Sequence, residues 1–341
     1  MKKLKKILIF LFVLTSAKMF ANTNNLFSLN LSADIGITNG LISEFVFEPR
    51  SYNTNDVLSR LDWQIKNIPV INFDGKVTLF KYGFLHANGF FALPKSSGCI
   101  EDYDWLNCLP IREGGFNLPQ EYGTEVTNYS WHNNHLASYY GFGISVGTNF
   151  IVPIIHFRFS PYISYQYEYI AFDGTNGYKK YKAENWQKKD FSGKVISYFQ
   201  EINSFLLGLD FEVPVFSHFG FSGSFSISPN ATFIQALDFH YINKKDNYGN
   251  YYGTVFLDTL NSAFQLQTDA TIYANINRHN KLSVSCFVQY IPTAKGNDYC
   301  KFITTDGIYI KPDDKWMQTG TNNAGTSRFL YKINLGYTYS F

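Results

Sequence analysis

The stretch 221–241 of this chain alternates between polar and apolar residues over its whole length. Its even positions are mostly small and polar and end in Asp238 and His240, whereas its odd positions are mostly aromatic or aliphatic. A period of two is the side-chain period of a β-strand, so one face of this strand is polar and the other is apolar. About ten tilted strand residues cross a bilayer. The length therefore favours a transmembrane barrel strand, with lipid outside and water inside, over a strand of a soluble sheet.

Residues 1–21 have the pattern of a secretory signal peptide. Lysines near the start precede an apolar run from Ile7 to Ala17, and Ala21 is the expected last residue removed, with Ala17 as the alternative. The apolar run is shorter than the roughly 20 residues that a spanning helix needs. We therefore expect a signal peptide at 1–21 and a single exported β-barrel domain at 22–341.

The charge of the exported part argues against a nucleic-acid partner. Removing the first 21 residues deletes five lysines and no acidic residue, so the formal net charge falls from +2 to −3. Aromatic residues make up 18% of the chain, which suits lipid-facing strands with interfacial girdles. The chain ends on NLGYTYSF, and its terminal Phe341 is typical of the signal that outer-membrane barrels present to their assembly machinery. Together these features predict an outer-membrane location.

The same alternation predicts ten strands. We place them at residues 27–47, 58–72, 76–92, 125–149, 151–172, 196–216, 219–241, 254–276, 281–295 and 327–341. A tight turn is expected at Asp74-Gly75. Short connections alternate with long polar ones, which are expected near 48–57, 93–124, 173–195, 242–253 and 296–326. The predicted fold class is all-β, a ten-stranded antiparallel transmembrane β-barrel with long extracellular loops.

Two pairs of polar residues are expected to meet at the external mouth of this barrel. Asp102 and Asp104 share one face if their segment is extended, and Asp238 and His240 do the same on another strand. A carboxylate fixes the tautomer of a neighbouring imidazole and raises its basicity, which makes a general base for water. Two close carboxylates resist double ionisation, so one of them can hold a proton. Each pair alone is more often a solvated surface feature.

The four cysteines leave several pairings open. Export permits disulfides, and Cys99–Cys108 would close a short loop, while Cys286 and Cys300 could pair or stay free. Their spacing matches no zinc pattern, so we expect no metal ion and no other cofactor.

The arrangement of motifs resembles the omptin family of outer-membrane proteases. The family's Asp-x-Asp-Trp and Asp-x-His motifs are matched by Asp102-Tyr103-Asp104-Trp105 and by Asp238-Phe239-His240. Four further family motifs are matched, in order, by Ala33-Asp34-Ile35, by Glu44, Val46 and Phe47, by Ser59, Leu61, Asp62 and Trp63, and by Lys295-Gly296-Asn297. The matches span nearly the whole exported chain.

The resemblance implies that the protein is an endopeptidase that cleaves peptides or proteins. Water would be activated between the dyad of Asp238 and His240 and the pair of Asp102 and Asp104, without a metal ion or a covalent intermediate. Family members that cleave between basic residues line their S1 pocket with two acids, and one of these corresponds to Glu44. The other corresponds to Ala236, so a preference for a basic P1 residue is expected in weakened form.

The resemblance also bears on lipopolysaccharide. Enteric members hold its phosphates with two arginines, and the matching positions here are Tyr169 and Glu201. Neither residue can pair with phosphate as arginine does, so dependence on lipopolysaccharide is doubtful.

Two alternatives remain at this point. A catalytically inactive adhesin or binding barrel would share the fold but would not need Asp102, Asp104, Asp238 and His240 together. A narrow pore ranks last, because a barrel of this size is largely filled by its own side chains.

Overall fold

The computed structural model of the chain describes residues 27–47, 57–105, 125–152, 157–216, 218–245, 251–304 and 316–341. The expected signal peptide at 1–21 lies outside these residues. The strands in the described part are β1 (Phe27–Phe47), β2 (Val57–Leu79), β3 (Gly83–Ala92), β4 (Lys95–Asp104), β5 (Asn128–Thr148), β6 (Phe150–Val152), β7 (Phe157–Tyr181), β8 (Lys189–Pro214), β9 (Phe219–Lys245), β10 (Tyr251–Asn275), β11 (Asn280–Thr304) and β12 (Met317–Ser340). A 3-10 turn, η1 (Lys182–Glu184), lies between β7 and β8. In this part of the chain, no helix is long and apolar enough to cross a membrane.

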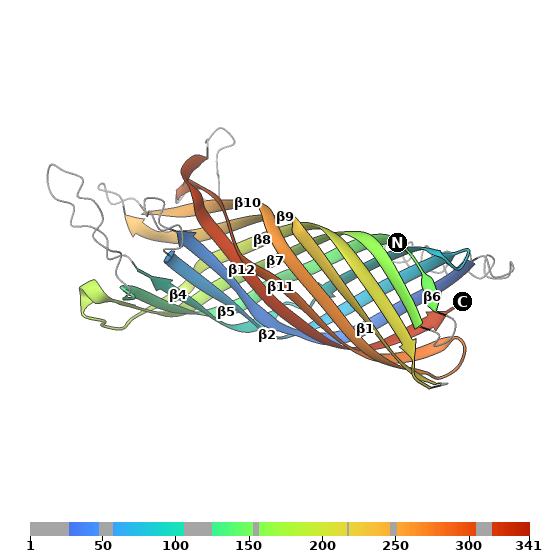
Figure 1. The fold of residues 1–341 in the computed structure, drawn as a ribbon. Coiled ribbons are helices and arrows are strands. Elements are labelled where there is room, and N and C mark those ends of the chain that lie inside the picture. Colours follow the sequence, from blue (N-terminus) through green and yellow to red (C-terminus); the bar gives the residue numbers. More distant parts are fainter. Residues whose placement is uncertain are drawn as a thin grey trace, which may run out of the picture.

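The strands close into one antiparallel ring, in which they wind obliquely around a cylinder (Figure 1). The ring closes where β1 pairs with β12, so the two ends of the barrel domain lie side by side. β3 and β4 share one position, because both pair with β2 on one side and β5 on the other. β6 pairs only with β7 among the described strands. The twelve strands therefore occupy ten positions, and the predicted ten-stranded barrel is confirmed.

Two expectations about the third strand position were wrong. Asp74 and Gly75 do not form a turn, because they pair with β1 and β3 inside β2. The turn lies later, at Phe80 and Lys81, which both adopt positive φ values. The segment after Pro94 was expected to be a loop, but it forms β4 because its backbone is paired with β2 and β5.

Alternation sorts the side chains as expected. Along β9, Ser226, Ser228, Thr232 and Asp238 are buried inside the barrel, whereas Phe225 faces outward. Exposed apolar side chains form a belt around the outside, which includes Ile35 and Ile37 on β1, Phe142 and Ile144 on β5, Phe205 and Leu207 on β8, and Ile333 and Leu335 on β12. This belt marks the membrane-spanning part of the barrel.

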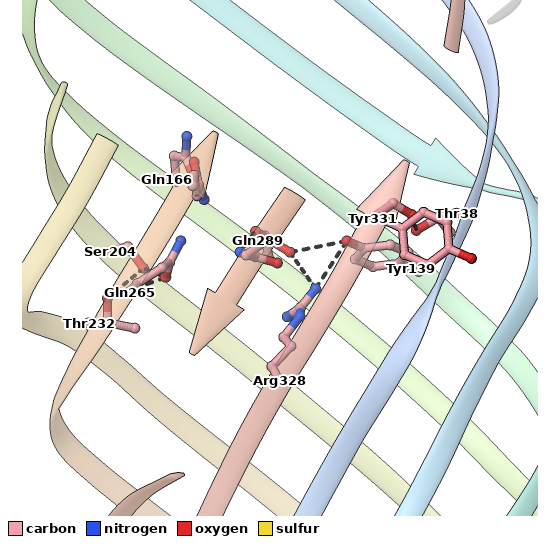
Figure 2. A network of polar contacts seen from close by, with 11 residues as sticks. Thr38, Tyr139, Gln166, Ser204, Thr232, Gln265, Gln289, Arg328 and Tyr331 are labelled. Carbon is pink, nitrogen blue, oxygen red and sulfur yellow. Dashed lines mark hydrogen bonds and ion pairs between the residues drawn. The ribbon is translucent and has the colours of Figure 1, made fainter. Parts of the chain in front are cut away.

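A charged layer crosses the interior at the level of the belt (Figure 2). Nη2 of Arg328 lies 2.6 Å from Oε2 of Glu168 and donates to the hydroxyl of Tyr139 over 3.0 Å. Gln289 donates from Nε2 to the other carboxylate oxygen of Glu168 over 2.7 Å. A neighbouring cluster joins Ser204 and Gln265 through a hydrogen bond of 2.7 Å (Figure 2). The interior is therefore filled with packed and hydrogen-bonded side chains at this level.

An apolar cluster separates this charged layer from the mouth with the long connections. Trp63 is fully buried there and stacks against Phe172 and Tyr198, with ring centroids 5.6 Å and 5.2 Å away. A polar cavity of about 450 Å³ lies at the opposite end, near the short turns. The cluster forms a packed apolar base beneath the mouth, against which polar side chains can be positioned.

Candidate active site

The first acidic pair lies at the end of β4. Asp102 is opposite Leu61 on β2 and Ser130 on β5, and Asp104 is two residues further along. Because β4 is extended, the two carboxylates share one face of the strand. The predicted arrangement is therefore present, although the pair sits on a strand rather than in a loop.

The second pair lies on β9, which neighbours β8 and β10. Nε2 of His240 lies 2.5 Å from Oδ2 of Asp238. The Asp238 side chain is 5% exposed and the His240 side chain is 36% exposed, so the carboxylate is buried beneath an accessible imidazole. The remaining carboxylate oxygen of Asp238 is buried without a hydrogen-bond partner among the described residues.

The two pairs share one electrostatic environment, and both lie beyond the apolar belt. Burial raises the pKa of Asp102 to about 8, and repulsion from Asp104 adds to this shift, while attraction to His240 opposes it. Burial also raises the pKa of Asp104, against hydrogen bonds from Ser59 and Asn128 and the attraction of His240. The structure thus brings all four predicted residues to one mouth of the barrel.

Two residues of β5 that the sequence reasoning missed support Asp102. Ser130 donates from Oγ to Oδ2 of Asp102 over 3.1 Å, and Nε2 of His132 lies 2.8 Å from the same Oγ. Burial and the nearby His240 lower the pKa of His132 to about 4. A neutral His132 with its proton on Nε2 can donate to Ser130, which leaves the serine proton for Asp102. Their spacing of two residues on one strand is the signal that could have found them.

Glu44 and Ala236 also lie at this mouth. Glu44 is 4% exposed on β1, and one of its carboxylate oxygens has no hydrogen-bond partner among the described residues. Burial, followed by the charges of Asp238 and Asp258, raises the pKa of Glu44. Ala236 is 3% exposed and belongs to the apolar cluster around Trp63. The region beside the dyad therefore has one predicted acid, Glu44, and one small apolar residue, Ala236.

The described residues contain no group of three His, Cys, Asp or Glu side chains that could hold a metal ion. Cys99, Cys286 and Cys300 are free thiols, so the possible Cys286–Cys300 pairing is not made in this structure. Cys108 lies outside the described residues, and so does its possible pairing with Cys99.

The two positions considered for lipopolysaccharide are direct neighbours. Tyr169 on β7 is paired with Glu201 on β8. The ring of Tyr169 lies 5.2 Å from the ring of Tyr140, and Tyr167 donates from its hydroxyl to Glu201 over 3.3 Å. These contacts form an aromatic surface with one acid.

A closed ten-position ring with an outer apolar belt and ionisable side chains gathered at one mouth defines an outer-membrane β-barrel protein. The chain belongs to the omptin family, whose family model matches residues 25–341. Omptins are outer-membrane proteases, so the resemblance inferred from the motifs is confirmed at the level of family, fold and location.

Two individual proteins illustrate the similarity. The chain is 23% identical over 330 residues to the plasminogen activator of Yersinia pestis. The match covers 92% of this chain and 90% of that protein. Its fold is similar to that of the outer membrane protease OmpT from Escherichia coli, with a TM-score of 0.74 and 19% sequence identity. That match covers 92% of this chain and 97% of the other.

Proposed function

We propose that this omptin is an active endopeptidase that hydrolyses peptides or proteins at the external mouth of the barrel. The observation that carries the proposal is the contact of 2.5 Å between His240 and Asp238. The acids Asp102 and Asp104 stand close enough for His240 to act on the pKa of both. An adhesin has no need for a histidine held by a buried carboxylate next to a pair of acids with raised pKa values.

The dyad acts as the general base. The Asp238 carboxylate accepts the Nε2 proton of His240, which orients the imidazole and raises its basicity, and His240 takes a proton from water. The resulting hydroxide adds to the peptide carbonyl carbon and forms a tetrahedral intermediate. His240 then returns its proton to the departing amine, which completes hydrolysis without a covalent intermediate or a metal ion.

The acidic pair acts on the other side of the substrate. The raised pKa of Asp102 keeps this residue protonated near neutral pH, so it can donate a hydrogen bond to the developing oxyanion. Ser130 holds the Asp102 carboxyl group through Oδ2, and this leaves Oδ1 for the substrate. Asp104 contributes by keeping a proton on the pair through repulsion.

The proposed specificity is a preference for a basic residue at P1. Glu44 is buried beside the dyad with an unpaired oxygen, which a guanidinium or ammonium group can satisfy. We propose that residues 1–21 direct export and that the barrel domain functions without lipopolysaccharide, since Tyr169 and Glu201 replace the family's arginines.

The test is incubation of refolded protein with a mixed peptide library, followed by mass spectrometry of the products. We expect internal cuts enriched after arginine and lysine, and cleavage slower by about two orders of magnitude or more in a His240→Ala variant that retains the barrel. A folded wild-type barrel that cuts no peptide would instead support the inactive adhesin or binding barrel.

A further inference from the structure

Asp258 on β10 lies directly opposite Ala236 on β9. Paired residues of neighbouring strands point to the same face of a sheet, so Asp258 faces the interior beside the alanine. On its other side, Asp258 is opposite Asp298 on β11. Asp258 is 7% exposed and Asp298 is 6% exposed, so two buried acids continue the row that Ala236 begins.

The two acids hold each other in place. Their carboxyl groups share a hydrogen bond. Burial, together with the charge of Asp298, raises the pKa of Asp258. Thr319 on β12 donates from its hydroxyl to Asp298. Asp298 therefore holds Asp258 beside Ala236.

This part of the mouth has more buried acceptors than donors. Gln200 on β8, which is opposite Ala236, gives its Nε2 protons to Tyr198 and Thr326 over 2.9 Å and 3.1 Å. Its Oε1 atom is buried and has no partner among the described residues. One carboxylate oxygen of Glu44 and one of Asp298 are also buried without a partner among the described residues. Buried acceptors without donors are costly unless a ligand supplies the donors.

Asp258 also acts on Glu44 across the mouth of the barrel. Asp258 is among the strongest influences on Glu44, after burial and Asp238, although the two residues lie on β10 and β1. A cationic side chain between them would be attracted by both carboxylates and would donate to the unpaired oxygens. Arginine matches this need best, because its guanidinium carries five donors and no acceptor.

We propose that Asp258, positioned by Asp298, is the second acid of the S1 pocket and restores the recognition of arginine or lysine at P1 that Ala236 alone would weaken. This inference rests on the proposed protease function and names the residue that sets its specificity. The acid is supplied from β10 instead of β9, across one pair of strands. Discrimination of basic from neutral P1 residues is therefore stronger than the alanine predicts.

The test compares two peptides that are identical except for arginine or citrulline at P1, since citrulline has nearly the shape of arginine without its charge. Wild-type protein should prefer the arginine peptide in kcat/KM. Asp258→Asn should reduce the ratio of the two kcat/KM values by about tenfold or more, the scale of one good charged contact, through the arginine peptide alone. Adding Ala236→Asp to Asp258→Asn should restore most of the ratio.

Asp269→Asn is the matched control, because it removes an acid from the same strand, near the opposite end of the barrel, and should leave the ratio unchanged. Asp298→Asn serves as a second variant that keeps the Asp258 carboxylate. It should raise KM for the arginine peptide and leave kcat for the citrulline peptide unchanged.

An unchanged ratio in Asp258→Asn, with or without a lower melting temperature, overturns the inference and gives the acidic row a structural role only. Cleavage that still depends on His240 would then leave the proposed function intact. If folded wild-type protein cleaves neither peptide, the proposed function fails, and the inference fails with it.

Discussion

Ser130 on β5 donates its hydroxyl proton to Asp102 on β4 over 3.1 Å, within the pair of strands that carries the acidic side of the mouth. This hydrogen bond opposes the rise in the Asp102 pKa that burial and Asp104 produce. The protonation of Asp102 is therefore balanced by two neighbours that act in opposite directions. This balance gives the proposed mechanism a pH dependence that can be tested from both sides.

Activity should fall as the pH rises through about 8, because Asp102 then loses the proton that it donates to the oxyanion. Asp104→Asn removes a repulsion, lowers the pKa of Asp102 and should move this loss of activity to lower pH. Ser130→Ala removes a hydrogen bond to the ionised form, raises that pKa and should move the loss to higher pH. The measurement is kcat/KM against pH for the three proteins. Shifts in the same direction for both variants would contradict this role of Asp102.

Removal of the dyad should abolish most of the catalysis while the barrel remains folded. Asp238→Asn and His240→Ala should each lower kcat by about two orders of magnitude or more, the usual contribution of general-base catalysis. His279→Ala is a matched control, since His279 lies between β10 and β11, at the opposite end of the barrel, and contacts Ser340. Folding is checked by the faster migration of unboiled protein on a gel. Full activity of folded His240→Ala would rule out the mechanism.

The buried pair of Arg328 and Glu168 should be far more sensitive to losing one partner than to losing both. Arg328→Met removes the ion-pair partner of the buried Glu168 carboxylate and should cost about 3–5 kcal/mol of unfolding free energy. Adding Glu168→Gln should recover much of this loss. Urea unfolding in detergent provides the free energies. Equal losses in the single and double variants would mean that packing, and not charge, controls this layer.

Lipopolysaccharide should not be needed for activity. Tyr169 and Glu201 form a paired aromatic and acidic surface that offers no cation to a phosphate group. Protein refolded in detergent without lipopolysaccharide should therefore be active, and added lipopolysaccharide should leave its kcat/KM unchanged. A Tyr169→Arg/Glu201→Arg variant supplies two cations for the phosphate groups, and added lipopolysaccharide should raise its kcat/KM. Strict dependence of the wild type would show that other side chains bind the phosphates.

The exported protein should begin at Asn22. Cleavage after Ala21 removes the lysine-rich start and leaves a domain with a formal net charge of −3. Mass spectrometry of protein taken from outer membranes gives the mature mass directly. A mass that corresponds to a start at Lys18 would favour the alternative site after Ala17.

The sequence by itself determined the class of fold and the two residue pairs of the candidate site. Side-chain alternation is a local property with a period of two, so it correctly separated the lumen-facing row of 221–241 from its lipid-facing row. The same period placed Asp102 with Asp104, and Asp238 with His240, on shared faces before their strands had been placed in space. Motif order across the chain was enough to identify the family.

Only the tertiary structure decided which residues of different strands meet. The turn at Phe80 and Lys81, and the strand that carries Asp102, depend on backbone pairing with β1, β2 and β5, which no local pattern encodes. Ser130 is distant in sequence from Asp102, which it supports. Asp258 is likewise separated in sequence from Ala236, at whose position the family's second acid is missing. Ser130 and Asp258 reach Asp102 and Ala236 because barrel closure fixes the stagger of every strand pair at once, and this register is a non-local property.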